Sequence, residues 1–357
     1  MKHLELFSGI GGFRRALDLI SVDTDTKFET IGFSEIDKGA IKTYKTVYPE
    51  SSKELDLGDS VKLTEKDDII MSLPDFQILT GGFPCQPFSM MGAQQGFEED
   101  RGQMFFKILD ILRVKRPKYV LLENVKNLYT HDKGRTYGRI QQELESLGYH
   151  VLTNIFNTSD FHLPQKRNRV LIFATTNPIS SKVSKGFNPV TIKDLFDKHI
   201  HQSSLLHFES VADVLSKSVQ NKYYLSERIK PTILANGSAN FISSSEINQD
   251  IARPLTASMH KMHRACQDNY YSQDYIDSHG KENCAKNMTK EELAKQPIRR
   301  ITPEEAFALQ GFPPSFAAAA SVSGVSDGAL YKQAGNAVSV NTIYAVVYYL
   351  IMNKVIK

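Results

Sequence analysis

The chain has 357 residues, of which 41% are hydrophobic and 23% charged, a balance typical of a folded globular protein with room for two domains. Three cysteines without a Cys-x-x-Cys pair exclude a zinc ribbon and a disulfide scaffold. The formal net charge of +3 is small, so a nucleic-acid surface would have to come from local basic clusters and not from a general positive field.

The N-terminal residues predict a strand, a glycine-rich turn and a helix. Residues 4–7 are apolar, residues 8–12 read Ser-Gly-Ile-Gly-Gly, and apolar residues then recur at helical spacing. Glycines at such a turn let backbone N–H groups approach a polar ligand. A second apolar run, 30–33, leads to Glu35, where nucleotide-binding α/β folds place a carboxylate for a ribose. The strict dinucleotide and triphosphate motifs are absent, and an ordinary tight turn remains the alternative.

Residues 81–89 read Gly-Gly-Phe-Pro-Cys-Gln-Pro-Phe-Ser, and their glycines and prolines break any regular element. We therefore expect Cys85 on a tight turn that follows a buried strand at 76–79. Open α/β sheets place their sites at such strand ends. Residues 90–102 predict a long polar loop, a candidate lid.

The next elements alternate between helix and strand. We expect a helix over 104–112, then a buried strand over 119–122 that ends in Glu123 and Asn124, with helix capping as the alternative role for this polar pair. A helix over 140–147 and strands over 151–156 and 170–174 follow. This alternation predicts an α/β fold, with a mostly parallel sheet and helices on both faces.

The composition changes near residue 177, where Ser, Asn and other polar residues become frequent. We expect residues 1–180, completed by 331–357, to form a catalytic and cofactor-binding domain, and residues 181–330 to form a smaller, irregular domain. Residues 302–305, Thr-Pro-Glu-Glu, predict a capping box for a helix that stops at Gly311. A final helix is expected over 339–353.

No signal peptide or membrane-spanning stretch is evident, which predicts a cytoplasmic protein with no membrane partner. His260, His263 and Cys266 are spaced like metal ligands. No fourth ligand lies nearby in the sequence, so we expect no metal site.

In this order, the motifs closely resemble those of the DNA (cytosine-5)-methyltransferases, particularly the compact bacterial restriction-modification type. The similar segments are 7–13 (cofactor loop), 82–89 (nucleophile), 101–106, 123–125 (acid), 165–169 (Gln-x-Arg-x-Arg), 300–313 and 333–338. The resemblance implies a Rossmann-like, class I S-adenosylmethionine-dependent methyltransferase fold, with the smaller domain serving target recognition.

The chemistry of this family explains the residue types. Cytosine C5 becomes nucleophilic after a thiolate adds at C6, and the resemblance implies that Cys85 supplies the thiolate. Glu123 would protonate N3, while Arg167 and Arg169 would hold the base, with Arg167 as the more direct contact. The target cytosine must leave the DNA stack to be reached.

The same resemblance implies the ligand contacts. S-adenosyl-L-methionine, released as S-adenosyl-L-homocysteine, would be bound by Phe7, Gly9, Gly11, Glu35, Ile36, Asp59, Phe83, Asn336 and Val338. Double-stranded DNA with a specific site would be contacted by Gln86, Ser89, Gln165, Arg253 and Thr256. Two positions depart from the family pattern, because Ile36 replaces a common aromatic residue and Pro254 a common threonine.

Two alternatives remain on the same fold: an RNA (tRNA) cytosine-5 methyltransferase and a catalytically silent DNA-binding regulator. The long polar region at 180–295 favours specific DNA, and the presence of Cys85, Glu123 and Arg167 favours an enzyme. We expect a monomer that protects host DNA from a cognate restriction endonuclease, a functional partner that need not bind to it.

Overall fold

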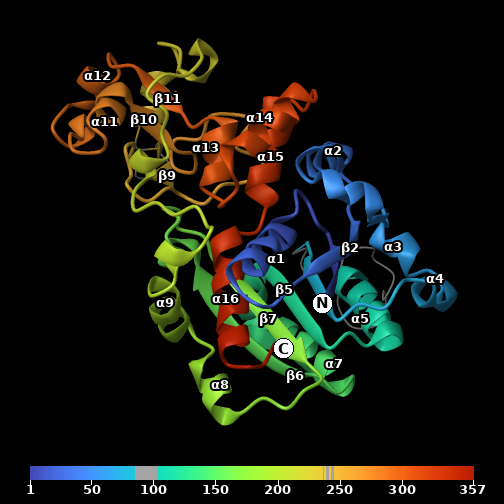
Figure 1. Cartoon of the computed structure of the whole chain (residues 1–357). Coiled ribbons are helices and arrows are strands. Elements are labelled where there is room, and N and C mark those ends of the chain that lie inside the picture. Colours follow the sequence, from blue (N-terminus) through green and yellow to red (C-terminus); the bar gives the residue numbers. More distant parts are fainter. Residues whose placement is uncertain (85–102, 236, 239–240, 243–244) are drawn as a thin grey trace. The chain divides into compact units, whose positions relative to one another are not determined.

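The computed structural model describes residues 1–84, 103–235, 237–238, 241–242 and 245–357 (Figure 1). The chain forms two compact units, and each is described by itself. Unit 1 comprises Met1–Asn157, Asn168–Ser204 and Thr342–Lys357, and unit 2 comprises Thr158–Arg167 and Leu205–Asn341. These bounds differ from the expected domains, because residues 181–204 belong to unit 1 while residues 158–167 and 331–341 belong to unit 2.

A seven-stranded sheet forms the centre of unit 1, with strand order β3-β2-β1-β4-β5-β7-β6. The strands are β1 (Lys2–Leu6), β2 (Glu29–Ser34), β3 (Leu55–Asp56), β4 (Ile78–Gly82), β5 (Tyr119–Val125), β6 (His150–Asn157) and β7 (Asn168–Thr175). Strands β1 to β5 pair in parallel, as expected, whereas β7 is antiparallel to both β5 and β6. A parallel return needs about a dozen residues, usually with a helix. Only residues 158–167 join β6 to β7, so the two strands pair antiparallel.

Helices cover the sheet of unit 1. They are α1 (Gly12–Asp23), α2 (Lys38–Val47), α3 (Ser60–Leu63), α4 (Asp67–Met71), α5 (Gln103–Lys115), α6 (Asn127–Thr130), α7 (Arg135–Ser146), α8 (Ser181–Gly186), α9 (Pro189–Asp197) and α16 (Val340–Met352). Apolar residues of α3, α4, α5 and α7 form one buried cluster with alternate residues of β1, β4, β5 and β7. Helices α1 and α16 lie on the opposite face (Figure 1).

One described stretch, Asp327–Met352, is long and apolar enough by composition to cross a membrane. It consists of two helices in the structure, α15 (Asp327–Asn336) and α16. The most apolar 18 residues of this stretch are 78% buried inside the protein, as is common for core helices.

Unit 2 is built from short elements joined by irregular segments, as its polar sequence predicts. Its described helices are α10 (Lys230–Leu234), α11 (Gln273–Asp277), α12 (Lys290–Leu293), α13 (Pro303–Ala308), α14 (Pro314–Val322) and α15. Its strand pairs are β8 (Gly237–Ser238) with β9 (Phe241–Ile242) and β10 (Tyr270–Ser272) with β11 (Ile298–Arg300), both antiparallel.

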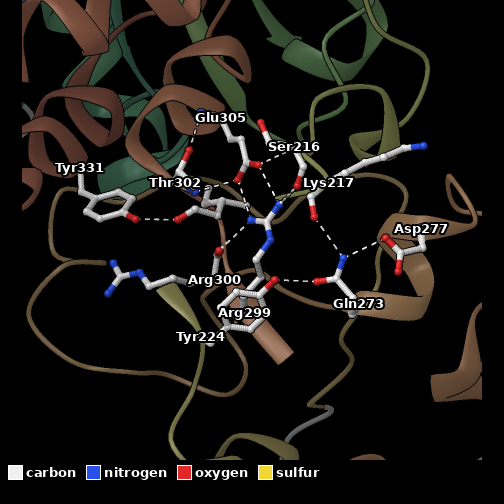
Figure 2. Close-up of polar contacts among 11 residues, drawn as sticks. Ser216, Lys217, Tyr224, Gln273, Asp277, Arg299, Arg300, Thr302, Glu305 and Tyr331 are labelled. Atoms are coloured by element: carbon white, nitrogen blue, oxygen red, sulfur yellow. Dashed lines mark hydrogen bonds and ion pairs between the residues drawn. The ribbon is translucent and has the colours of Figure 1, made fainter. Parts of the chain in front are cut away.

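A buried ion pair joins three segments of unit 2 (Figure 2). The guanidinium of Arg299, in the middle of β11, donates from Nη1 to Glu305 Oε2 at 2.9 Å and from Nη2 to Oε1 at 2.8 Å. The Glu305 carboxylate also accepts from the backbone N–H groups of Ser216 and Thr302, both at 2.7 Å. The contact with Thr302 completes the predicted capping box of α13. Four donors therefore satisfy a carboxylate that is only 2% exposed.

Replacing Arg299 with leucine should destabilise the protein strongly. The Glu305 carboxylate would stay buried without its cation, and such losses cost about 3–5 kcal/mol. The exposed pair Lys222–Asp327, with an N–O distance of 2.7 Å, provides the control in the same unit. Lys222→Ala should cost less than about 1 kcal/mol. The free energy of unfolding from denaturant titration measures both, and equal losses would contradict the importance of the buried pair.

Candidate active site

The ends of β4 and β5 bring the predicted nucleophile turn and the predicted acid to one edge of the sheet. Gly82, the last residue of β4, pairs with Glu123 in the parallel ladder. Phe83 follows, and its buried ring lies 5.9 Å from that of Phe105, measured between centroids. Cys85 comes two residues later, and it lies outside the described residues together with Gln86 and Ser89.

Asn124 connects these two strand ends through a side-chain bond that the sequence analysis did not identify. Its Nδ2 donates to the carbonyl oxygen of Phe83 at 2.9 Å, and its Oδ1 accepts from the backbone N–H of Val125 at 2.8 Å. Asn124 is 2% exposed. Glu123 and Asn124 both lie inside β5, and neither side chain caps the following helix α6, so the capping alternative is wrong.

Glu123 forms an ion pair with Arg169. The Nε atom of Arg169 lies 2.9 Å from Glu123 Oε1, and the two side chains are 19% and 11% exposed. Arg169 stands near the start of β7, opposite Val125 in the antiparallel ladder. A guanidinium in this place fixes the carboxyl group and puts a positive charge beside it.

Arg167 is engaged within unit 2, and its expected role as the more direct base contact stays a prediction. Its guanidinium belongs to unit 2 and donates to backbone carbonyl oxygens of Leu255, Gly335 and Ala337 at 2.8–3.1 Å. Only 2% of the residue is exposed. The spacing of the motif cannot distinguish its two arginines, because the chain passes from unit 2 into β7 between them.

Gln165, the expected DNA contact, is bonded within unit 2. Gln165 is fully buried. Its Nε2 donates to the Leu309 carbonyl oxygen at 2.9 Å, and its Oε1 accepts from the Leu255 N–H at 3.0 Å. A side-chain amide used in this way supports the protein itself. The other two candidates in unit 2 are half-buried: Arg253 donates to the Glu246 carbonyl oxygen at 2.8 Å, and Thr256 Oγ1 accepts from Arg264 at 2.7 Å.

The glycine turn after β1 has the backbone that its sequence predicts. Phe7, Gly9 and Gly11 have positive φ angles of 53°, 56° and 78°. A β-carbon at Gly11 would lie 2.7 Å from the ring of Tyr48, whose hydroxyl donates to the Gly11 carbonyl oxygen at 3.0 Å. Glycine is therefore required at position 11, and Tyr48 fixes the turn that precedes α1.

Glu35 fixes a second part of the same sheet edge. Its Oε2 accepts from the Gly9 N–H, and its Oε1 accepts from the N–H groups of Ile36 and Asp37, all at 2.8 Å. Ile36 is 73% exposed, so its apolar side chain is available to a ligand at this turn. Asp59 accepts from the Val61 N–H at 2.9 Å and caps α3.

These cofactor candidates follow β1, β2 and β3, whose carboxyl ends share one edge of the sheet. Phe83 follows β4 at the same edge, with its ring in the core. Asn336, which is exposed, and Val338, which is buried, belong to unit 2. Among the described residues, no three or more His, Cys, Asp or Glu side chains are grouped to hold a metal ion.

Two ionisable side chains of β1, those of Glu5 and His3, are fully buried. Burial raises the pKa of Glu5 to about 8, although the charge of Arg14 acts in the opposite direction. Burial, assisted by Arg14, lowers the pKa of His3 to about 3. The His3 ring bonds to the hydroxyls of Thr30 and Thr80 at 2.9 and 2.7 Å.

Comparisons with known proteins agree with this geometry. A family model described as C-5 cytosine-specific DNA methylase matches residues 1–351. Type II methyltransferase M1.ScrFI of Lactococcus lactis subsp. cremoris is 37% identical over 352 residues, which cover 97% of this chain and 76% of that protein. Type II methyltransferase M.SsoII of Shigella sonnei is 36% identical over 343 residues, covering 96% and 78%. The S. pombe Dnmt2 methyltransferase structure has the same fold, with a TM-score of 0.69, 20% identity and 99% of both chains covered.

The chain therefore belongs to the C-5 cytosine-specific DNA methylase family, and it is a DNA (cytosine-5)-methyltransferase. This result confirms the resemblance seen in the sequence motifs. It favours DNA methylation over the RNA-directed and catalytically silent alternatives.

Removing the Asn124 side chain should slow methyl transfer more than it affects folding. Asn124→Ala frees the end of β4, and we expect the rate to fall about 10- to 100-fold, because small displacements of reacting groups are costly. Asn154 on β6 offers a matched control, since its Nδ2 donates to the Phe187 carbonyl oxygen at 3.1 Å and its Oδ1 accepts from the next N–H at 2.9 Å. Asn154→Ala should lower the melting temperature without changing the rate. Equal rate losses in the two variants would show that Asn124 has no special position.

The buried Glu5 carboxyl should make stability fall as pH rises. Between the ordinary carboxyl pKa of 4.5 and about 8, the folded state keeps a proton at Glu5 that the unfolded state has lost. Stability should therefore decline by about 1.4 kcal/mol per pH unit in this window. Glu5→Gln removes this dependence, so its melting temperature relative to the unmodified protein should rise from pH 5.5 to pH 8. A constant difference across that range would show that Glu5 titrates normally.

Proposed function

We propose that this enzyme transfers a methyl group from S-adenosyl-L-methionine to C5 of a cytosine flipped out of a short, specific site in duplex DNA. Cys85 acts as the nucleophile, with Glu123 and Arg169 at the base. The observation that carries this proposal is the Glu123–Arg169 ion pair at the end of β5, directly opposite Gly82.

The sequence leads directly from the end of β4 to Cys85. Asn124 of β5 holds the Phe83 carbonyl oxygen, and Cys85 is the second residue after Phe83 in the sequence. This connection supports a thiol and a carboxyl group that act on the same ring.

The reaction begins when the Cys85 thiolate bonds to C6 of cytosine and the C5–C6 π electrons are released towards C5. Glu123, protonated when the base binds, donates its proton to N3, which makes this addition easier, and takes it back when the ring is restored. The Arg169 guanidinium, already fixed beside Glu123, stabilises the charge that develops on the base. After C5 is methylated, a base removes the C5 proton and the thiolate leaves C6, which restores the ring.

The residues at the ends of β1 to β3 fit S-adenosyl-L-methionine, which supplies an electrophilic methyl group and leaves as S-adenosyl-L-homocysteine. Glu35 is held by three backbone N–H groups and would hold the ribose, and exposed Ile36 would contact the adenine. Phe7, Gly9 and Gly11 would line the approach, and Asp59 would face the adenine amine. The family motif at 333–338 supports Asn336 and Val338 as further contacts, and the motif at 82–89 supports Phe83.

Several wider assignments belong to the same proposal. Residues 181–330 would recognise the target, with Arg253, Thr256, Gln86 and Ser89 at the DNA. The enzyme would act as a cytoplasmic monomer and protect host DNA from a restriction endonuclease. The names of the relatives, Type II methyltransferases, support this restriction-modification role.

Base-resolution bisulfite sequencing tests the proposal. The chain is expressed in a host free of cytosine methylation, and plasmid DNA is sequenced. Methylation confined to one short motif is the expected result. Unmethylated plasmid, despite folded protein that binds S-adenosyl-L-methionine by calorimetry, would contradict the proposal and direct the search to tRNA.

Cys85→Ala should lower the rate of methyl transfer at least about 10³-fold, because no other nucleophile can replace the thiolate in the covalent step. Binding of duplex DNA should persist, since groove and phosphate contacts do not need the thiol. Cys284→Ala, at a half-buried cysteine of unit 2, serves as the control and should keep its activity. Residual turnover near the normal rate in Cys85→Ala would exclude the proposed nucleophile.

A further inference from the structure

The backbone of Leu255 is held from both sides by the motif at 165–169. The Leu255 N–H donates to Gln165 Oε1 at 3.0 Å, and its carbonyl oxygen accepts from Arg167 Nη1 at 3.0 Å. Gln165 and Arg167 are 0% and 2% exposed, and all three residues lie in unit 2. Thr256, a proposed DNA contact, is the next residue along the chain.

The same guanidinium caps the C-terminal end of α15. Arg167 Nη2 donates to the carbonyl oxygens of Gly335 and Ala337 at 3.1 and 2.8 Å. Gln310 Nε2 donates to the preceding carbonyl oxygen, that of Ala334, at 2.7 Å. The last carbonyls of a helix have no partner within it and carry partial negative charge, so a buried cation is favourable there. One side chain thus fixes Leu255 relative to the end of α15.

Gly335 brings the two backbones into direct contact. A β-carbon at this position would lie 2.2 Å from the carbonyl carbon of Thr256 and 2.4 Å from the backbone nitrogen of Ala257. Both atoms belong to the main chain, so a side chain at 335 cannot be accommodated unless residues 256–257 move. Glycine allows this close approach.

We infer that Gln165, Arg167 and Gly335, together the Leu255 clamp, are positioning residues that hold residues 255–257 in place for DNA contact. This inference rests on the proposed function, which assigns Thr256 to the DNA, and it deepens that function by naming what supports the contact. Arg264 donates to Thr256 Oγ1 at 2.7 Å and pairs with Asp268 at 2.8 Å. The hydroxyl hydrogen of Thr256 can therefore donate to an acceptor such as a phosphate oxygen. A segment already fixed in place loses little entropy when DNA binds.

Gly335→Ala tests the clamp, and Gly328→Ala is its matched control. Both glycines lie in α15, but a β-carbon at 328 would meet only the ring of His260 at 3.4 Å, an ordinary contact. The dissociation constant for a fragment of the sequenced plasmid should rise about tenfold or more in Gly335→Ala. The dissociation constant for S-adenosyl-L-methionine should change less than about threefold, because the atoms nearest the new methyl group belong to residues 256–257. Gly328→Ala should leave both constants unchanged.

Unchanged DNA affinity in folded Gly335→Ala would overturn the inference, as would equal losses of DNA and cofactor affinity. If Gly335→Ala does not fold, Gln165→Met decides, because a thioether of similar length is only a weak acceptor for the Leu255 N–H. It should weaken DNA binding in the same selective way, and unchanged binding would again overturn the clamp. Thr256→Ala separates the two proposals: if it has no effect while Gly335→Ala weakens binding, the clamp stands and the Thr256 contact is wrong.

Discussion

The antiparallel direction of β7 is the constraint on which the active site depends. Because β7 runs against β5, its first residues meet the last residues of β5, and Arg169 reaches Glu123 at the edge where β4 also ends. A parallel β7 would place this arginine at the opposite edge of the sheet. The direction follows from the short connection between β6 and β7, which leaves no room for a crossover helix in unit 1. The direction of β7 therefore places Arg169 beside Glu123.

Buried ionisable groups are accommodated in two ways. On β1, Glu5 and His3 are shifted towards their neutral forms by burial. Elsewhere buried charges are paired: Arg14 with Glu54 at 2.6 Å in unit 1, and Arg299 with Glu305 at 2.8 Å in unit 2. Backbone groups complete the hydrogen bonds of the second pair, because irregular segments offer N–H and C=O groups that a sheet has already used.

Hydrophobic periodicity and turn residues predicted the parallel part of the sheet, the glycine turn and the capping box of α13. These features depend on local sequence. The direction of β7, the Asn124 bond to Phe83 and the burial of Arg167 could not be predicted in this way, because each depends on residues far apart in the chain. The family motif indicated that both arginines matter, but the contacts within each unit were needed to separate their positions. The roles of Cys85 and the cofactor residues stay predictions.

The clamp on Leu255 has a consequence for how this enzyme can diversify. The bonds that Gln165 and Arg167 make to Leu255 are to its backbone N–H and C=O, a pair of groups that every residue except proline carries. Gly335 likewise contacts the main chain of residues 256–257. Side chains along this segment can therefore be exchanged during evolution while their support is inherited unchanged. The proposed DNA contacts of this segment can then change by substitution, without redesign of the scaffold that holds its backbone.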